Sequence, residues 1–308
     1  MRGLALAIGL TCAGCNESEV PVGLDFKALP PITESELAPL GSYRTRDGDE
    51  LPVRHYPAES ETTLLLVHGS AYHSRYLAPL AQRLARSGAA RVYTPDLRGH
   101  GQSPERRGDI DSIDQLEDDL ADLAAHAREQ HPGSRVVVGG HSSGGGLAVR
   151  FAGSRHADLA DGTLLLAPFL GHDAPTTREN AGGWAHPHLP VIIGLSILNG
   201  FGITALHGVT ALTFDMPEPV RDGTETLTYS FRLMTGFAPR DYRQDLSGVS
   251  HPVLALIGSE DEAFLPGQLA PALSSVTDAE VEIMPGIGHL DLPSAPATAD
   301  TITRWLRN

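Results

Sequence analysis

The chain has 308 residues, of which 41% are hydrophobic and 20% charged, and this composition is typical of a globular protein with a large core. Its formal net charge of −15 argues against a nucleic-acid partner, because phosphate binding needs clustered Lys and Arg. Both cysteines, Cys12 and Cys15, lie near the N-terminus, which excludes a disulfide or a cysteine metal site from the body of the chain.

The start of the chain predicts an export signal. Residues 1–10 give a charged start and a short apolar run that is too short to span a bilayer. Ala13-Gly14-Cys15 resembles a bacterial lipobox, although Cys12 stands where that pattern usually has leucine. We expect residues 1–15 to be a signal peptide, and the protein to be periplasmic or anchored to a membrane through lipidated Cys15. Plain secretion and a cytoplasmic tail are the alternatives. Residues 16–38, rich in Glu, Pro and Ser, are expected to form a flexible tether.

Strand and helix patterns alternate along the rest of the chain. Asp47-Gly48 lies between two strand-like runs and predicts an antiparallel hairpin. Apolar, β-branched runs then predict buried parallel strands, and amphipathic runs predict the helices between them. The predicted strands are 63–67, 91–96, 135–138, 163–168, 252–258 and 281–284, and the clearest predicted helices are 77–87, 112–127 and 298–306. The alternation predicts an α/β fold with a mostly parallel central sheet flanked by helices.

Regular alternation stops between about residues 169 and 243, where glycines and prolines are frequent. We predict that this segment is a cap inserted after the sixth strand, over the sheet edge where open α/β sheets bind ligands. Trp184, Ile192 and Leu195 are its candidates for substrate contact. The alternative is that the segment only packs on the core.

A nucleophile motif follows the predicted strand 135–138. Gly140-His141-Ser142-Ser143-Gly144 matches the G-x-S-x-G turn between a strand and a helix, in which the serine hydroxyl is exposed and glycines allow close packing. The predicted strand 63–67 ends in a second glycine-bearing turn, His68-Gly69-Ser70-Ala71. We predict Ser142 as the nucleophile and the backbone N–H groups of Ser70 and Ser143 as oxyanion donors.

An acid and an imidazole follow the last two predicted strands. A serine hydroxyl needs an imidazole to take its proton, and the imidazole needs a carboxylate to fix its tautomer. Asp261 and His289 come after Ser142 in the order serine, acid, histidine that this motif predicts. Glu260 and Glu262 are alternative acids, whereas Asp291 is a more natural loop residue.

Other histidines offer weaker alternatives. His186-x-His188 is the closest pair for a metal hydrolase, but it lies in a proline-rich stretch without a nearby carboxylate in the sequence. His100 lies in a glycine-rich loop and is interpreted as a histidine satisfied by backbone groups. We therefore predict neither a metal nor a cofactor.

Three segments together resemble the monoacylglycerol lipase and lysophospholipase branch of the α/β-hydrolases: 68–76, 95–103 and 140–145. The resemblance covers about residues 40–168 and 250–308. It implies one α/β-hydrolase domain over residues 39–308 that contains the cap, and a serine esterase. The implied reaction passes through an acyl-enzyme on monoacylglycerol, lysophospholipid or similar small acyl esters.

Two other functions stay open from the sequence. One is a peptidase of the same fold, for which a carboxylate in the cap, Glu179, Asp215 or Glu218, could bind the free amino terminus of a peptide. The other is a binding protein that keeps the fold without catalysis. A small-molecule ester is the partner that the resemblance favours.

Overall fold

The computed structural model describes residues 23–29, 32–34, 37–102, 104–178 and 183–308. The predicted signal peptide 1–15, its Cys15 and the first part of the predicted tether lie outside the described residues. Within the described chain, no helix is long and apolar enough to cross a membrane.

The predicted sheet is confirmed. Eight strands lie in the order β1-β2-β4-β3-β5-β6-β10-β11, in which the hairpin of β1 and β2 is antiparallel and the strands from β4 to β11 are parallel. Every residue of β3, β6 and β10 is buried, as their apolar sequences require. The strands are β1 (Leu40–Arg44), β2 (Glu50–Tyr56), β3 (Thr62–Val67), β4 (Arg91–Pro95), β5 (Arg135–His141), β6 (Gly162–Leu166), β10 (Val253–Gly258) and β11 (Glu280–Met284).

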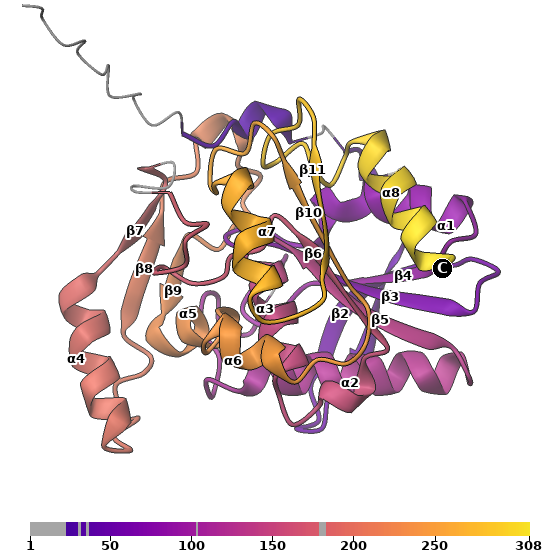
Figure 1. Ribbon diagram of the computed structural model, residues 1–308. Helices are drawn as coiled ribbons and strands as arrows, with labels where there is room; N and C mark the ends of the chain where they lie inside the picture. The colour runs from indigo at the N-terminus through magenta and orange to yellow at the C-terminus, as the bar shows by residue number, and fades with distance from the viewer. Residues whose placement is uncertain (1–22, 30–31, 35–36, 103, 179–182) are drawn as a thin grey trace, which may run out of the picture.

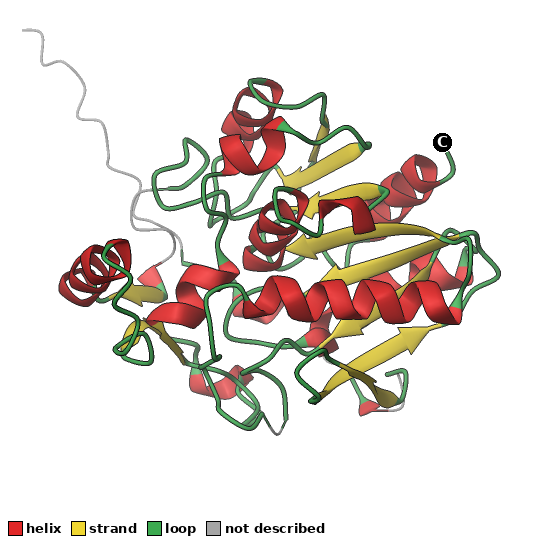
Figure 2. Cartoon of the chain, turned by 90° about the horizontal axis from the view of Figure 1, so that it is seen from below, coloured by secondary structure: helices red, strands yellow, loops and turns green. Residues whose placement is uncertain are grey.

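Helices cover both faces of this sheet. Figure 2 shows the long helix α2 in front of the strands and the C-terminal helix α8 behind them. Helix α1 packs with α8, whereas α3 contacts α2 and α6. The helices that flank the sheet are α1 (Ala78–Arg86), α2 (Gln115–Gln130), α3 (Ser143–Ala152), α6 (Tyr242–Ser247), α7 (Pro266–Ser274) and α8 (Pro296–Leu306).

The predicted insertion follows β6 and has a small sheet of its own. Its strands β7 (Ala185–Pro187), β8 (Thr210–Phe214) and β9 (Thr228–Ser230) are antiparallel and lie to one side of the main sheet in Figure 1. Helix α4 (Leu189–Gly200) packs on β8, and α5 (Phe231–Phe237) follows β9 directly. The cap is therefore a separate layer that returns to the main sheet through α6.

The prediction that residues 16–38 form a flexible tether is wrong for residues 24–28. Leu24 and Phe26 are buried, and residues Phe26–Ala28 form a short 3₁₀ helix capped by the Asp25 side chain. The Phe26 ring meets the cap residue Trp184 edge to face, with ring centroids 5.7 Å apart. Leu29, Ile32 and Leu37 pack against the same core as Leu24 and Phe26, and the burial of these apolar side chains holds the segment against the domain.

Candidate active site

The sharp turn at Ser142 is strained and closely packed. Ser142 lies between β5 and α3 with φ of 57°, a conformation that residues other than glycine rarely adopt. A Cβ atom at Gly140 would meet the backbone of Gly144 at 2.3 Å, and one at Gly144 would meet the carbonyl oxygen of His68 at 2.4 Å. Only glycine therefore fits on either side of the serine, and the turn directs Ser142 into a cavity that His289 also lines.

The imidazole of His289 is fixed by a buried carboxylate. Its Nδ1 lies 2.8 Å from Oδ2 of Asp261, and both side chains are at most 2% exposed. The other oxygen of Asp261 accepts the N–H groups of Ala263 at 2.9 Å and Phe264 at 2.7 Å. A carboxylate can only accept, so Nδ1 of His289 donates, and in the neutral ring Nε2 is then the nitrogen that can take a proton.

The structure separates the alternative acids from this pair. Glu260 is exposed, whereas the side chain of Glu262 accepts the backbone N–H of His289 at 2.8 Å. Glu262 therefore positions the histidine main chain and does not contact its ring. The backbone carbonyl of Asp291 accepts the N–H groups of Ser294 and Ala295 in the loop that follows.

The two predicted oxyanion donors lie side by side. Ser143 is the first residue of α3, so its N–H has no partner within the helix. On either side of Ser70, the N–H of Gly69 and the N–H of Ala71 are each donated to a tyrosine hydroxyl at 2.7 Å. In the part of the chain that the structure describes, the Ser70 N–H donates no hydrogen bond. The hydroxyls of Ser70 and Ser143 are 2.7 Å apart, which joins the two turns.

Tyr76 and His141 lie within the predicted motifs, and they connect these parts in a way that the motifs do not indicate. The Tyr76 hydroxyl accepts the Gly69 N–H and lies 2.9 Å from Nδ1 of His141. Nε2 of His141 lies 3.0 Å from the carbonyl oxygen of His289 and donates to it. Burial and the nearby His289 hold the pKa of His141 well below its usual value, so its Nδ1 stays free to accept from Tyr76.

A small apolar cavity of about 30 Å³ lies over these groups. This volume holds about one water molecule. Its lining includes Ser142 and His289, but no carboxylate among the residues that the structure describes. The remaining lining residues are Leu24, Phe26, Leu29, Gly69, Ser70, Tyr72, Tyr76, His141, Trp184, Met216 and Leu290.

Of the three predicted cap contacts, the structure brings only Trp184 to this cavity. Ile192 and Leu195 do not line it. Leu195 is buried against Ala211 and Phe231 instead, and Ile192 packs on the same cluster. These side chains hold α4 to the small cap sheet. The sequence pattern of α4 does not indicate that it packs on this sheet and not on the cavity.

The acidic cap residues and the histidine pair do not form a site. Glu179 lies outside the described residues, and Asp215 and Glu218 are exposed. The expectation that His186 has no carboxylate nearby is wrong. Strand β7 pairs with β8, and this brings Oδ2 of Asp215 to 3.0 Å from Nε2 of His186. Over the described ranges, no group of three or more ligating side chains could hold a metal ion.

Comparisons with known proteins relate the whole domain to hydrolases. The model of the family described as "Serine aminopeptidase, S33" matches residues 58–292. A monoacylglycerol lipase of Mycolicibacterium smegmatis is 24% identical over 262 residues, which are 79% of this chain and 87% of that protein. Human monoglyceride lipase is 30% identical over 152 residues, which are 49% of this chain and 46% of that protein.

Solved structures of two lipases share the fold. The monoacylglycerol lipase of Paleococcus ferrophilus matches with a TM-score of 0.63 and 21% identity, over 84% of this chain and 98% of that one. A soluble variant of the monoglyceride lipase of Saccharomyces cerevisiae, in complex with a substrate analogue, matches with a TM-score of 0.64 and 19% identity, over 90% of this chain and 97% of that one. These likenesses show the α/β-hydrolase fold.

Proposed function

Because the chain belongs to the serine aminopeptidase S33 family of α/β-hydrolases, we propose that it is a serine hydrolase and that its substrates are small carboxylic esters. One observation carries the proposal. The buried pair of His289 and Asp261, with Nδ1 and Oδ2 2.8 Å apart, and the strained turn of Ser142 meet at one cavity. Strain and buried charge of this kind persist where a site uses them.

The proposed reaction has two halves. In the first, Nε2 of His289 takes the Oγ proton as Ser142 attacks the acyl carbonyl, and the proton then passes to the leaving alcohol. In the second, His289 takes a proton from water as the water oxygen attacks the acyl carbon, and that proton then passes to Ser142 Oγ as the bond between Oγ and the acyl carbon breaks and the acid leaves. Asp261 holds the ring and stabilises its charged form. The N–H groups of Ser70 and Ser143 bind the oxyanion, each worth roughly 3 kcal/mol in the transition state.

The cavity supports an ester of an apolar acid over a peptide. An aminopeptidase needs a carboxylate for the free ammonium group of its substrate, and none lines the described cavity. Trp184, Met216 and Leu290 present apolar surface there instead, so an acyl chain that widens this small cavity would contact apolar side chains. Relatives named monoacylglycerol lipase support the same choice, so monoacylglycerols, lysophospholipids and similar esters are the proposed substrates.

We also propose that the protein is exported and attached to a membrane through lipidated Cys15. The charged start, the apolar run and the lipobox-like residues support this proposal. Incorporation of radiolabelled palmitate into the full chain, lost in Cys15→Ser, is the expected result, and equal labelling of both would refute the anchor.

Labelling by a fluorophosphonate tests the serine chemistry. We expect the folded protein to be labelled, the Ser142→Ala variant to be unlabelled, and the neighbouring Ser143→Ala variant to be labelled. p-Nitrophenyl esters of increasing chain length then measure the acyl preference, and amino-acid p-nitroanilides measure peptidase activity. Equal rates on acetate and longer esters would contradict the apolar acyl site, and faster cleavage of the anilides would favour the peptidase.

A further inference from the structure

Ala71, next to the proposed oxyanion donor Ser70, has a strained backbone. Its φ is 64°, and it is fully buried. A residue other than glycine in this region costs on the order of 1–3 kcal/mol and persists only where the surroundings hold it. The contacts of Ala71 therefore show what fixes the turn that presents the Ser70 N–H.

The cap holds both polar backbone groups of Ala71. The hydroxyl of Tyr229, on β9, accepts the Ala71 N–H at 2.7 Å, although the two residues are 158 positions apart. The N–H of Thr226, just before β9, donates to the Ala71 carbonyl oxygen at 2.9 Å. A single segment of the insertion thus fixes the Ala71 peptide groups on both sides.

His100 orients the tyrosine hydroxyl. Its Nδ1 lies 3.1 Å from the carbonyl oxygen of Arg98 and its Nε2 lies 2.6 Å from the Tyr229 hydroxyl. Burial keeps the pKa of His100 well below its usual value, so the ring is neutral. Since Nδ1 must donate to the carbonyl, Nε2 accepts the Tyr229 proton, and the tyrosine oxygen is left to accept from Ala71.

The segment that carries Tyr229 has little freedom to move. The Ser230 N–H donates to the Gly108 carbonyl oxygen at 2.8 Å, and the Thr226 hydroxyl donates to the carbonyl of Gly99 at 3.1 Å. A Cβ atom at Gly108 would lie 2.0 Å from the Thr228 carbonyl oxygen, so the two chains approach as closely as glycine permits. The hydroxyl is therefore held in place as well as aimed.

We propose that Tyr229, oriented by His100, is a positioning residue that holds the turn at Ala71 so that the Ser70 N–H points to the oxyanion. This inference rests on the proposed serine hydrolase function. The insertion then contributes to oxyanion binding, because Ser70 follows a strand of the main sheet and Tyr229 of the insertion fixes the direction of the Ser70 N–H. The Tyr76 hydroxyl does the same for Gly69 on the other side of Ser70.

Tyr229→Phe tests the proposal, with Tyr93→Phe as its matched control. Tyr93 lies on β4, and its hydroxyl also bonds a histidine, with 3.0 Å to Nε2 of His131, away from the site. Because displacing an oxyanion donor weakens transition-state binding, we expect Tyr229→Phe to lower kcat about 10- to 100-fold with KM within about twofold. Affinity for a trifluoromethyl ketone analogue, which forms the oxyanion, falls in proportion, and Tyr93→Phe changes neither.

A second pair of variants applies if Tyr229→Phe does not fold. His100→Gln keeps an acceptor near the position of Nε2, whereas His100→Leu removes it. We expect kcat to fall in the leucine variant and to be largely restored in the glutamine variant. Unchanged kcat in folded Tyr229→Phe, or equal loss in both His100 variants, would overturn the positioning role. Failure of the unaltered protein to react with a fluorophosphonate would instead refute the proposed function.

Discussion

His68 makes the folded protein sensitive to acid. It lies fully buried at the end of β3, where its Nε2 accepts the Leu97 N–H at 3.1 Å and its Nδ1 donates to the Gly69 carbonyl oxygen at 2.8 Å. A proton on Nε2 would break the first of these bonds and leave a charge in the core. Burial accordingly lowers the pKa of His68 to about 4.

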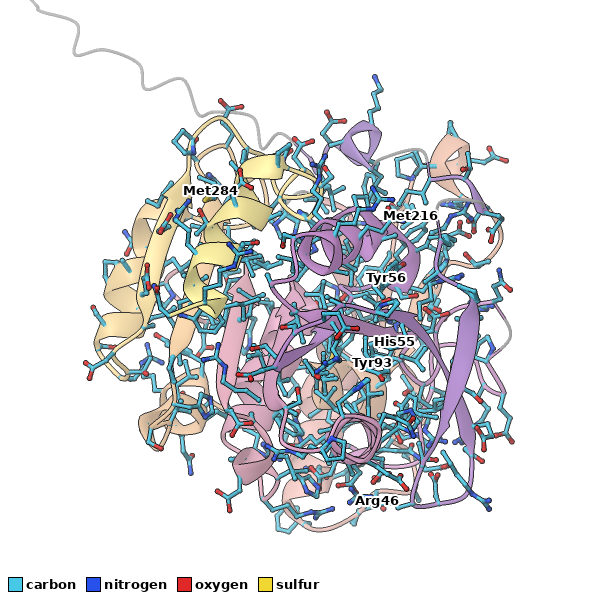
Figure 3. All side chains as sticks on the ribbon, turned by 90° about the vertical axis from the view of Figure 1, so that its right-hand side faces the viewer. Arg46, His55, Tyr56, Tyr93, Met216 and Met284 are labelled. Carbon is cyan, nitrogen blue, oxygen red and sulfur yellow. The ribbon has the colours of Figure 1, made fainter. Side chains whose placement is uncertain are left out.

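The sign of the effect follows from proton uptake. Between about pH 6.5 and about pH 4 the unfolded chain carries a proton on residue 68 and the folded chain does not, so the free energy of unfolding falls as the pH falls. With a pKa of about 6.5 in the unfolded chain and about 4 in the folded chain, the free energy of unfolding falls by about 2 kcal/mol as the pH is lowered from about 7.5 to about 5. His55, stacked on Tyr93 with ring centroids 4.2 Å apart (Figure 3), has its pKa lowered by burial to about 4 and adds in the same direction.

Urea unfolding at these two pH values measures the loss. His68→Gln is the informative variant, because the glutamine oxygen can accept the Leu97 N–H without titrating. We expect this variant to lose about 2 kcal/mol less than the unaltered protein over the interval. His172→Gln, at an exposed position, is the control and should keep the original pH dependence. Equal losses in His68→Gln and the unaltered protein would refute the assignment.

Three substitutions test other parts of the structure. Asp261→Asn keeps a side chain of the same shape but no charge, and we expect kcat for ester hydrolysis to fall about 10⁴-fold; a loss below tenfold would contradict its role. Gly144→Ala places a methyl group 2.4 Å from a backbone carbonyl oxygen, so thermal unfolding should show a loss of about 1–3 kcal/mol, whereas Gly194→Ala, with nothing within 4 Å, should show none. Phe26 lines the cavity, so Phe26→Ala should widen it and raise the ratio of kcat/KM for octanoate to that for acetate. Lys27→Ala is the control, and an equal ratio in the two variants would show that Phe26 does not limit the acyl site.

The sequence predicted the parts of the molecule that depend on short stretches of chain. The strand before Ser142 contains three consecutive buried valines, 136–138, and the glycines at 140 and 144 are needed because no Cβ fits there. Asp261 and His289 follow parallel strands, whose carboxyl ends meet at one edge of the sheet, so their proximity could be expected. The choice of Asp261 over Glu262 agrees with the geometry because only the aspartate reaches the ring.

Contacts between distant, weakly patterned segments could not be predicted. The apolar run of α4 is equally suited to a pocket wall and to a cap surface, and the structure leaves Ile193 and Ile197 more than half exposed. Leu24 and Phe26 belong to an alternating apolar run, Val20, Val22, Leu24, Phe26 and Ala28, and this period of two indicates a half-buried extended segment that the tether prediction did not use. The ring partner of Phe26, Trp184, lies in the irregular cap, so the sequence does not indicate which surface this segment packs against.

The turn that presents Ser70 shows why such contacts matter for the proposed catalysis. Its two neighbouring N–H groups are each donated to a tyrosine hydroxyl that lies beside a neutral, buried histidine: Tyr76 with His141, and Tyr229 with His100. The first tyrosine and histidine come from the main fold, and the second tyrosine from the cap. A backbone N–H held by its neighbours on both sides needs no reorganisation when charge develops on the substrate. The same sheet and elbow without the inserted strand β9 would therefore retain Ser142 and His289 and still lack half of the support for the oxyanion turn.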